Sequence, residues 1–144
     1  MKAFQAALMI TIVLFTVSGC QTRSDDVRVL ELAPIATIDQ HFADEAKKIV
    51  IAMDEVIETK GVNFNKQIYL AIKVKQFDRF RLKEIRKKGH DLVKKRFPDA
   101  KVHLSTDKKI FMELDKLERK LKDNQIDEKQ LEKELRKLEE LMKG

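Results

Sequence analysis

A strict alternation of apolar and polar residues over 67–75 constrains the fold of this chain most strongly. Every second residue is a large aliphatic one: Ile68, Leu70, Ile72 and Val74. Since successive side chains of a strand point to opposite faces, this pattern predicts a β-strand whose aliphatic side faces a core. The other side carries Tyr69 and lysines, and we expect it to face solvent. The chain should therefore contain a sheet, although its 38% of charged residues and its few Gly and Pro residues fit a helix-rich protein.

Helical periodicity occurs on both sides of this strand. Residues 39–55 carry an apolar stripe at helical spacing behind Asp39, a suitable N-cap. Residues 78–96 repeat the pattern, again behind an aspartate, and Pro98 ends this second helix. Gly89 lies within the second stripe, where glycine disfavours a helix. Close approach of the helix to the sheet would explain this glycine.

Two weaker strand patterns complete the predicted sheet. One alternates up to Phe64, before a short turn at Asn65-Lys66, and Gly61 interrupts it in the manner of a β-bulge. The other is short and covers 101–105. The order helix, strand, strand, helix, strand predicts a small α+β domain of αββαβ type. In it, two helices bury their stripes on one face of a three-stranded sheet.

The C-terminal residues 107–144 show a heptad pattern instead. Apolar residues fall in one register at Ile110, Leu114, Leu117, Leu121, Leu131, Leu135, Leu138 and Met142. Two geometries are open, a single long helix in a coiled coil and two helices folded into a hairpin. Asp127 and Gln130 form a capping-box pair that starts a new helix, which favours the hairpin with its turn at 123–124. The unbroken register favours the coiled coil.

The only cysteine, Cys20, follows an uncharged apolar run that is about as long as the apolar part of a signal peptide. Val17-Ser18-Gly19-Cys20 is similar to a bacterial lipobox, in which two small residues precede the lipidated cysteine. Cleavage before Cys20 would let it carry a diacylglycerol and acyl chains such as palmitate, which together hold a protein stably on a membrane. The alternative is an uncleaved N-terminal anchor helix with an incidental cysteine.

These patterns divide the chain into four parts. We expect a lipoprotein signal peptide over 1–19, the lipidated cysteine and a tether over 20–38, the αββαβ domain over 39–106 and a charged helical tail over 107–144. Removal of the first part takes away one charged residue, Lys2, and lowers the formal net charge from +6 to +5. Lipidation of the only thiol leaves no disulfide and no cysteine-based metal site.

The second predicted helix is strongly basic. Its candidate residues for binding an anionic surface are Arg79, Arg81, Lys83, Arg86, Lys87, Lys88, Lys94, Lys95 and Arg96. They could attract anionic lipid headgroups, an acidic protein partner or an acidic wall polymer. Export and the lack of base-reading or stacking residues make nucleic acid the least expected partner. The alternative without a binding role is a solvated face that aids solubility.

The sequence offers no catalytic residues, no cofactor motif and no metal site. It lacks a Gly-rich phosphate loop, a nucleophile motif and an HExxH motif. The histidines His41, His90 and His103 are far apart in the sequence, and we expect them at polar surface positions. The carboxylates within 113–140 alternate with lysines and arginines at helical spacing, which is typical of solvated ion pairs. A wall-degrading enzyme therefore has no candidate active site here.

The sequence also resembles the YhcN/YlaJ family of sporulation lipoproteins of endospore-forming bacteria, over roughly 40–122. The matching residues are Tyr69-Leu70-Ala71-Ile72-Lys73-Val74, Arg86-Lys87-Lys88 and Phe97-Pro98-Asp99-Ala100-Lys101-Val102-His103-Leu104-Ser105-Thr106-Asp107-Lys108-Lys109-Ile110-Phe111. The resemblance implies a lipoprotein at a spore membrane, with a supporting role in spore assembly or germination. The element order also resembles BON and ring-building modules, an analogy of fold alone.

From this we expect a non-enzymatic lipoprotein on the extracytoplasmic face of the cell or spore membrane. Lipid on Cys20 would fix its location, and the basic helix or the leucines of the tail would bind a partner. The alternative is a structural module that assembles with its own copies through the heptads.

Overall fold

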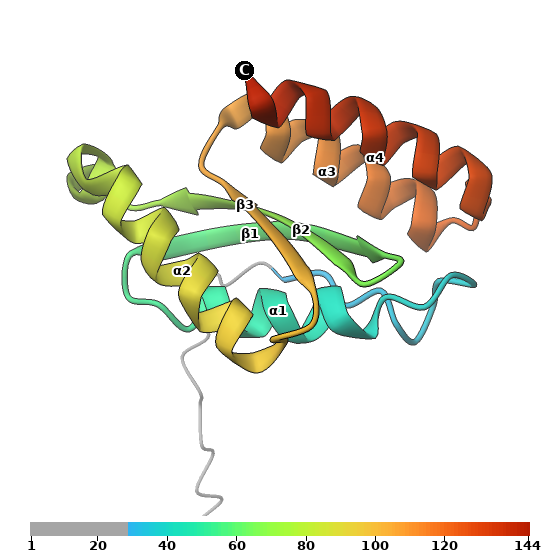
Figure 1. Cartoon of the computed structure of the whole chain (residues 1–144), viewed down its shortest axis with the longest axis horizontal. Helices are drawn as coiled ribbons and strands as arrows, with labels where there is room; N and C mark the ends of the chain where they lie inside the picture. The colour runs from blue at the N-terminus through green and yellow to red at the C-terminus, as the bar shows by residue number, and fades with distance from the viewer. Residues whose placement is uncertain (1–28) are drawn as a thin grey trace, which may run out of the picture.

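The computed structural model of the protein describes residues 29–144, which form four α-helices, a 3₁₀ helix and a three-stranded sheet (Figure 1). In chain order these are α1 (His41–Ile51), β1 (Val56–Phe64), β2 (Gln67–Val74), η1 (Gln76–Arg81), α2 (Leu82–Arg96), β3 (Lys101–Ser105), α3 (Lys108–Lys122) and α4 (Glu128–Lys143). The predicted α+β class and the αββαβ order are confirmed. Three predicted helix bounds are wrong. The first helix, α1, begins after Gln40 rather than at Asp39 and ends at Ile51 rather than at residue 55, and a 3₁₀ segment occupies the expected first turn of the second helix.

The sheet has the order β1-β2-β3, with β1 and β2 antiparallel and β3 parallel to β2. The turn at Asn65 and Lys66 has positive φ at both residues, 46° and 58°, as a two-residue hairpin turn requires. The pairing is irregular between Val56 and Glu58, whereas Gly61 pairs in register with Leu70. The predicted bulge at Gly61 is therefore wrong, and this glycine has another role.

One face of the sheet packs against α1 and α2. Ile68, Leu70 and Ile72, the aliphatic side of the alternating strand, lie in this core and are at most 2% exposed. The predicted close approach at Gly89 is confirmed, because a Cβ there would lie 2.8 Å from Leu104 Cδ2 of β3. The αββαβ part thus buries both helical stripes on one face, as its pattern predicts.

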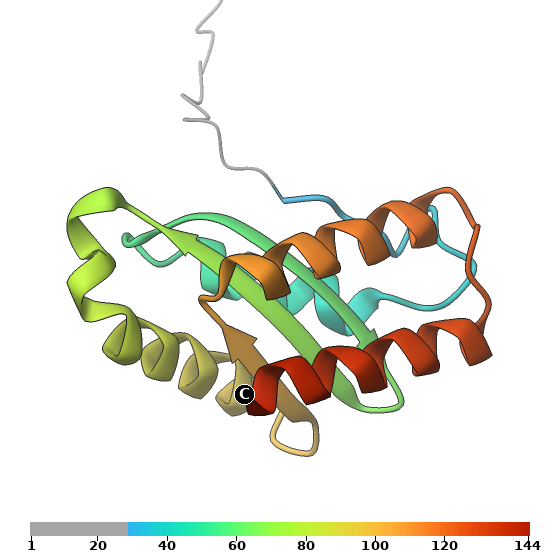
Figure 2. The ribbon, with the colours of Figure 1, turned by 90° about the horizontal axis from the view of Figure 1, so that it is seen from above.

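The opposite face is covered by α3 and α4, which fold into a hairpin (Figures 1 and 2). The heptad leucines of both helices pack against each other and against Val62, Tyr69 and Ala71 of the sheet. Tyr69 is only 2% exposed, so the prediction that this side of β2 faces solvent is wrong. The reason is that the leucine stripe of the hairpin needs a partner, and the moderately apolar face of the sheet provides one.

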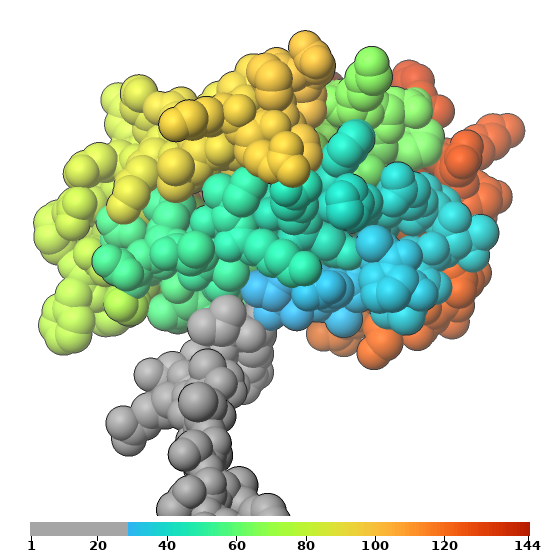
Figure 3. Space-filling view, turned by 90° about the horizontal axis from the view of Figure 1, so that it is seen from below, coloured from blue at the N-terminus to red at the C-terminus, as the bar shows by residue number. Residues whose placement is uncertain are grey.

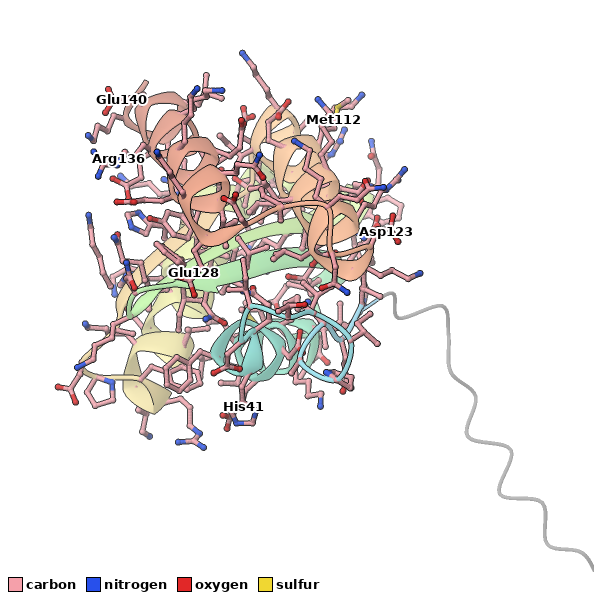
Figure 4. The ribbon with its side chains drawn as sticks, turned by 90° about the vertical axis from the view of Figure 1, so that its right-hand side faces the viewer. His41, Met112, Asp123, Glu128, Arg136 and Glu140 are labelled. Carbon is pink, nitrogen blue, oxygen red and sulfur yellow. The ribbon has the colours of Figure 1, made fainter. Side chains whose placement is uncertain are left out.

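The predicted turn between the helices of the hairpin is confirmed (Figure 4). Asn124 takes a left-handed conformation with φ 51° after the end of α3. Asp127 accepts a hydrogen bond from Gln130 N at 2.7 Å and its own N–H donates to Gln130 Oε1 at 3.1 Å, which completes the capping box. A new helix therefore starts at the residue that the sequence indicates, and the coiled-coil alternative is not adopted by this chain.

The segment before α1 packs on the domain instead of leaving it. Leu32 is fully buried, and the Asp44 carboxylate accepts hydrogen bonds from the Leu32 and Ala33 N–H groups at 2.8 and 2.6 Å. Thr37 donates to Asn124 Oδ1 in the turn between α3 and α4. The part of the expected tether after residue 31 thus belongs to the folded domain, while its residues 20–28 lie outside the described residues. Residues of 29–144 build both hydrophobic cores of the domain.

Candidate functional site

A cluster of buried charges lies at the outer edge of β1, where α1 and α3 meet. Lys47 of α1 and Glu118 of α3 are both fully buried, and Lys47 Nζ lies 3.1 Å from Glu118 Oε1 and 3.0 Å from Asp44 Oδ1. Lys47 also donates to the carbonyl of Leu30, and Lys60 lies 3.4 Å from the second oxygen of Glu118. Burial raises the pKa of the Glu118 carboxyl, and the charge of Lys47 opposes this shift.

Gly61 allows this cluster to cross the edge of the sheet. Its N–H points outward and donates to Glu118 Oε1 at 2.9 Å. A Cβ at this position would lie 2.5 Å from Leu70 Cδ2, 2.9 Å from the Tyr69 carbonyl oxygen and 3.3 Å from Lys47 Cγ. The cluster therefore joins two helices and an edge strand, and its charged groups form ion pairs with one another.

A second group of polar side chains lines an open groove of about 660 Å³ between α4 and the β1–β2 hairpin. The Tyr69 ring stacks on His103 with centroids 4.6 Å apart, and its hydroxyl donates to Glu139 Oε1 at 2.5 Å. Burial, with the hydrogen bond to Glu139, raises the pKa of Tyr69, whereas burial lowers the pKa of His103. Tyr69 therefore stays protonated and His103 stays neutral at neutral pH.

This network places His103 differently from its expected polar surface position, because the ring is stacked and its side chain is only 16% exposed. His41 and His90 lie next to Glu45 and Asp91, respectively, with much more exposed side chains. Among residues 29–144 no three His, Cys, Asp or Glu side chains converge as metal ligands would. The three histidines are thus not brought together.

The nine predicted basic residues share the solvent side of η1 and α2, and five of them have partners. The paired ones are Arg81 with Glu84, Lys87 with Asp91, Lys88 with Glu55, Arg96 with Glu45, and Lys94, which donates to the Ala100 carbonyl. The others are exposed and make no ion pair within the described part of the chain: Arg79, Lys83, Arg86 and Lys95. A set of free cations therefore remains on this surface.

Two aromatic residues beside these cations were missed by the sequence analysis. Phe77 and Phe80 of η1 are 87% and 84% exposed, and no residue of η1 is buried. A 3₁₀ helix has three residues per turn, so these two side chains lie on the same side of it. Their spacing, outside the apolar stripe of the following helix and among lysines and arginines, is the signal that could have revealed them. We call residues 75–83 the η1 tip.

The η1 tip lies at one end of the domain, and the turn between α3 and α4 lies at the other (Figures 1 and 2). The space-filling view shows this end projecting at the left edge, with α2 above it (Figure 3). The tip and the solvent side of α2 form a continuous cationic and aromatic surface, which is the candidate binding site of the described residues.

Comparisons with protein-family models, with curated proteins and with solved structures found no match to this chain. Within 29–144, none of the helices has the length and apolar character that crossing a membrane requires. The predicted lipidation residue, Cys20, lies outside the described residues.

Proposed function

We propose that this chain is a lipid-anchored, non-catalytic module that acts by tethering and association at a membrane. The observation that carries the proposal is the sequence Val17-Ser18-Gly19-Cys20, placed shortly before a domain with its own core. The anchor fixes where the domain acts. The resemblance to sporulation lipoproteins supports a spore membrane as the place, and spore assembly or germination as the process.

The use of the charged groups supports a role without catalysis. Lys47 and Glu118 are fully buried and pair with each other and with the backbone. Tyr69, which lines the groove beside α4, stacks on His103, donates a hydrogen bond to Glu139 and stays protonated. In both groups the polar side chains are held by ion pairs, hydrogen bonds or stacking within the domain, as is typical of a structural network.

In this proposal the cationic surface of α2 binds the anionic partner. Arg86 and Lys95 are exposed and have no ion-pair partner among residues 29–144, as is also true of Arg79 and Lys83. An anionic surface would gain these contacts without breaking existing pairs. The leucines of the tail, which were the other candidates for a partner site, are at most 4% exposed inside the hairpin. Assembly of copies through the heptads is therefore not part of this proposal.

The anchor is tested with the full chain and its Cys20→Ala variant, expressed in an endospore-forming bacterium that lacks the gene. We expect the natural chain in the membrane fraction, with a mass that shows an acylated N-terminal Cys20, and the variant outside that fraction. Thr22→Ala, outside the lipobox, should behave as the natural chain does. An intact Met1 with an unmodified thiol would contradict the anchor. Unchanged sporulation and germination in the gene-deleted cells would contradict the spore role.

A further inference from the structure

The exposure of Phe77 and Phe80 has no explanation within the fold. Both rings are more than four-fifths exposed, while the other described phenylalanines reach 41% at most, at Phe42. The segment that carries them contributes nothing to either core. Neighbouring exposed apolar groups of this kind mark a surface that is covered by something else.

The charge around the two rings identifies what covers them. Residues 73–88 contain eight basic and two acidic side chains, a net charge of +6. Both acids, Asp78 and Glu84, lie next to Arg81, so the cations Lys75, Arg79 and Lys83 stay available. Exposed aromatic side chains among lysines and arginines are typical of segments that lie at the boundary of an anionic bilayer.

We propose that the η1 tip inserts Phe77 and Phe80 into the headgroup region of an anionic bilayer, while Arg79, Lys83 and Arg86 contact lipid phosphates. This inference rests on the proposed membrane location and adds a second contact to it. The two rings stand on one side of a short turn that projects from the end of the domain (Figure 3), a shape that suits a soft, flat surface.

The length of chain before the domain makes this contact accessible. Eight residues lie between Cys20 and Val29, the first described residue. Fully extended, they span at most about 30 Å, which is about the diameter of a small domain. A lipid on Cys20 therefore keeps the tip within reach of the membrane. Anchor and tip together would fix the orientation of the domain on the membrane. The connection between α3 and α4, at the opposite end of the domain, would then point away from the bilayer.

Tryptophan fluorescence tests the insertion directly, because the chain contains no Trp. Phe77→Trp and Phe80→Trp are made in protein that lacks residues 1–20, which keeps both cores and removes any effect of the anchor. Phe42→Trp is the matched control, an aromatic exchange at the next most exposed phenylalanine, on α1. Vesicles contain phosphatidylglycerol with phosphatidylcholine, or phosphatidylcholine alone, with and without brominated acyl chains.

We expect a blue shift and quenching by brominated lipid for both tip variants on anionic vesicles, and neither effect for Phe42→Trp. A double variant, Phe77→Ser with Phe80→Ser, should lower partitioning into anionic vesicles roughly tenfold or more, with unchanged circular dichroism. Vesicle binding without a shift at either tip tryptophan would overturn the insertion, since it would show contact through α2 alone. Absence of vesicle binding, with capture of an acidic polypeptide instead, would also overturn it. Neither result depends on Cys20, so failure here is distinct from failure of the lipid anchor.

Discussion

At the scale of single residues, the buried ion pair between Lys47 and Glu118 is the most constrained feature of the domain. It links residues 71 positions apart in the sequence and supplies an acceptor for the outward N–H of Gly61 on an edge strand. Buried charges are tolerated only when they are fully paired, because the loss of one partner leaves the other desolvated and alone. This cluster therefore ties the two layers of helices together at one edge of the sheet.

Lys47→Met should lower the free energy of unfolding by about 3–5 kcal/mol at neutral pH, because it leaves Glu118 and Asp44 without their buried cation. Burial already raises the pKa of Glu118, and loss of Lys47 removes an opposing effect. A folded-state pKa above the unfolded value means that the folded protein binds more protons, so the variant should recover stability as the pH falls towards 4.5.

Urea denaturation at neutral pH and at about one unit above the unfolded pKa of glutamate measures this effect. Lys48→Met is the matched control, because Lys48 is exposed and pairs on the surface with Glu31. It should change stability little, and equally at both pH values. A loss for Lys47→Met that does not depend on pH would contradict the assigned role of Glu118.

Gly61→Ala should destabilise the domain by about 1–3 kcal/mol, because its Cβ would meet the Tyr69 carbonyl oxygen, which is fixed in the sheet. Gly89→Ala is the comparison. Its nearest neighbour would be Leu104 Cδ2, the end of a flexible side chain, and alanine favours the helix by about 1 kcal/mol. Thermal unfolding should therefore show a much larger loss of stability for Gly61→Ala than for Gly89→Ala. An equal or larger loss at Gly89 would contradict this account of the edge strand.

At the scale of elements, the turn between α3 and α4 decides whether the tail folds back. Asn124 is left-handed, and its side chain accepts hydrogen bonds from Thr37 N at 2.9 Å and Thr37 Oγ1 at 2.7 Å. The same residue thus shapes the turn and holds the segment before α1. Asp127 then starts α4 through its capping box.

Asn124→Ala should lower the free energy of unfolding by about 1–2 kcal/mol, because alanine disfavours the left-handed backbone and cannot accept the hydrogen bonds from Thr37. Asn124→Gly keeps the backbone freedom and loses only those bonds, so its loss should be smaller. Chemical denaturation measures the stabilities of the two variants, with Lys129→Ala on the exposed side of α4 as the control. If glycine proves as harmful as alanine, backbone strain does not contribute to the loss at this turn.

At the scale of the whole molecule, the sheet is covered on both faces by helices from the two halves of the chain (Figure 4). The αββαβ part alone leaves the side with Val62, Tyr69 and Ala71 without a cover. The hairpin supplies that cover and in doing so buries its own leucines. The tail is therefore part of the domain rather than an appendage to it.

Protein lacking residues 1–20 should sediment as a monomer at micromolar concentration, because its heptad leucines are already buried within one chain. The variant Leu135→Asp distinguishes a monomer from a protein that assembles with its own copies through the heptads. In a monomer the change places a charge in the core, so the domain should unfold. A natural dimer that the same substitution converts into a folded monomer would show that Leu135 lies at an interface between copies.

The sequence predicted the parts of the fold that depend on neighbouring residues. Alternation at 67–75 revealed β2, the spacing of Asp127 and Gln130 revealed the start of α4, and Gly89 indicated a close helix. It does not predict features that depend on distant residues. The pattern around Gly61 indicates a bulge, whereas the close contact with Lys47 that requires this glycine comes from another element. The exposure of Phe77 and Phe80 was not predicted, because periodicity indicates the buried stripe of a helix and gives no information on apolar residues outside that stripe.

The amino-acid order by itself indicated the strands, the four α-helices and their succession, and the capping box at Asp127 favoured a turn before it, because periodicity, capping and turn preferences act over a few residues. The tertiary structure alone decided that the second face of the sheet is covered, that residues 32–38 dock on the domain and that Lys47 meets Glu118. These outcomes follow from burial, which depends on which surfaces meet in space and therefore on the whole chain at once.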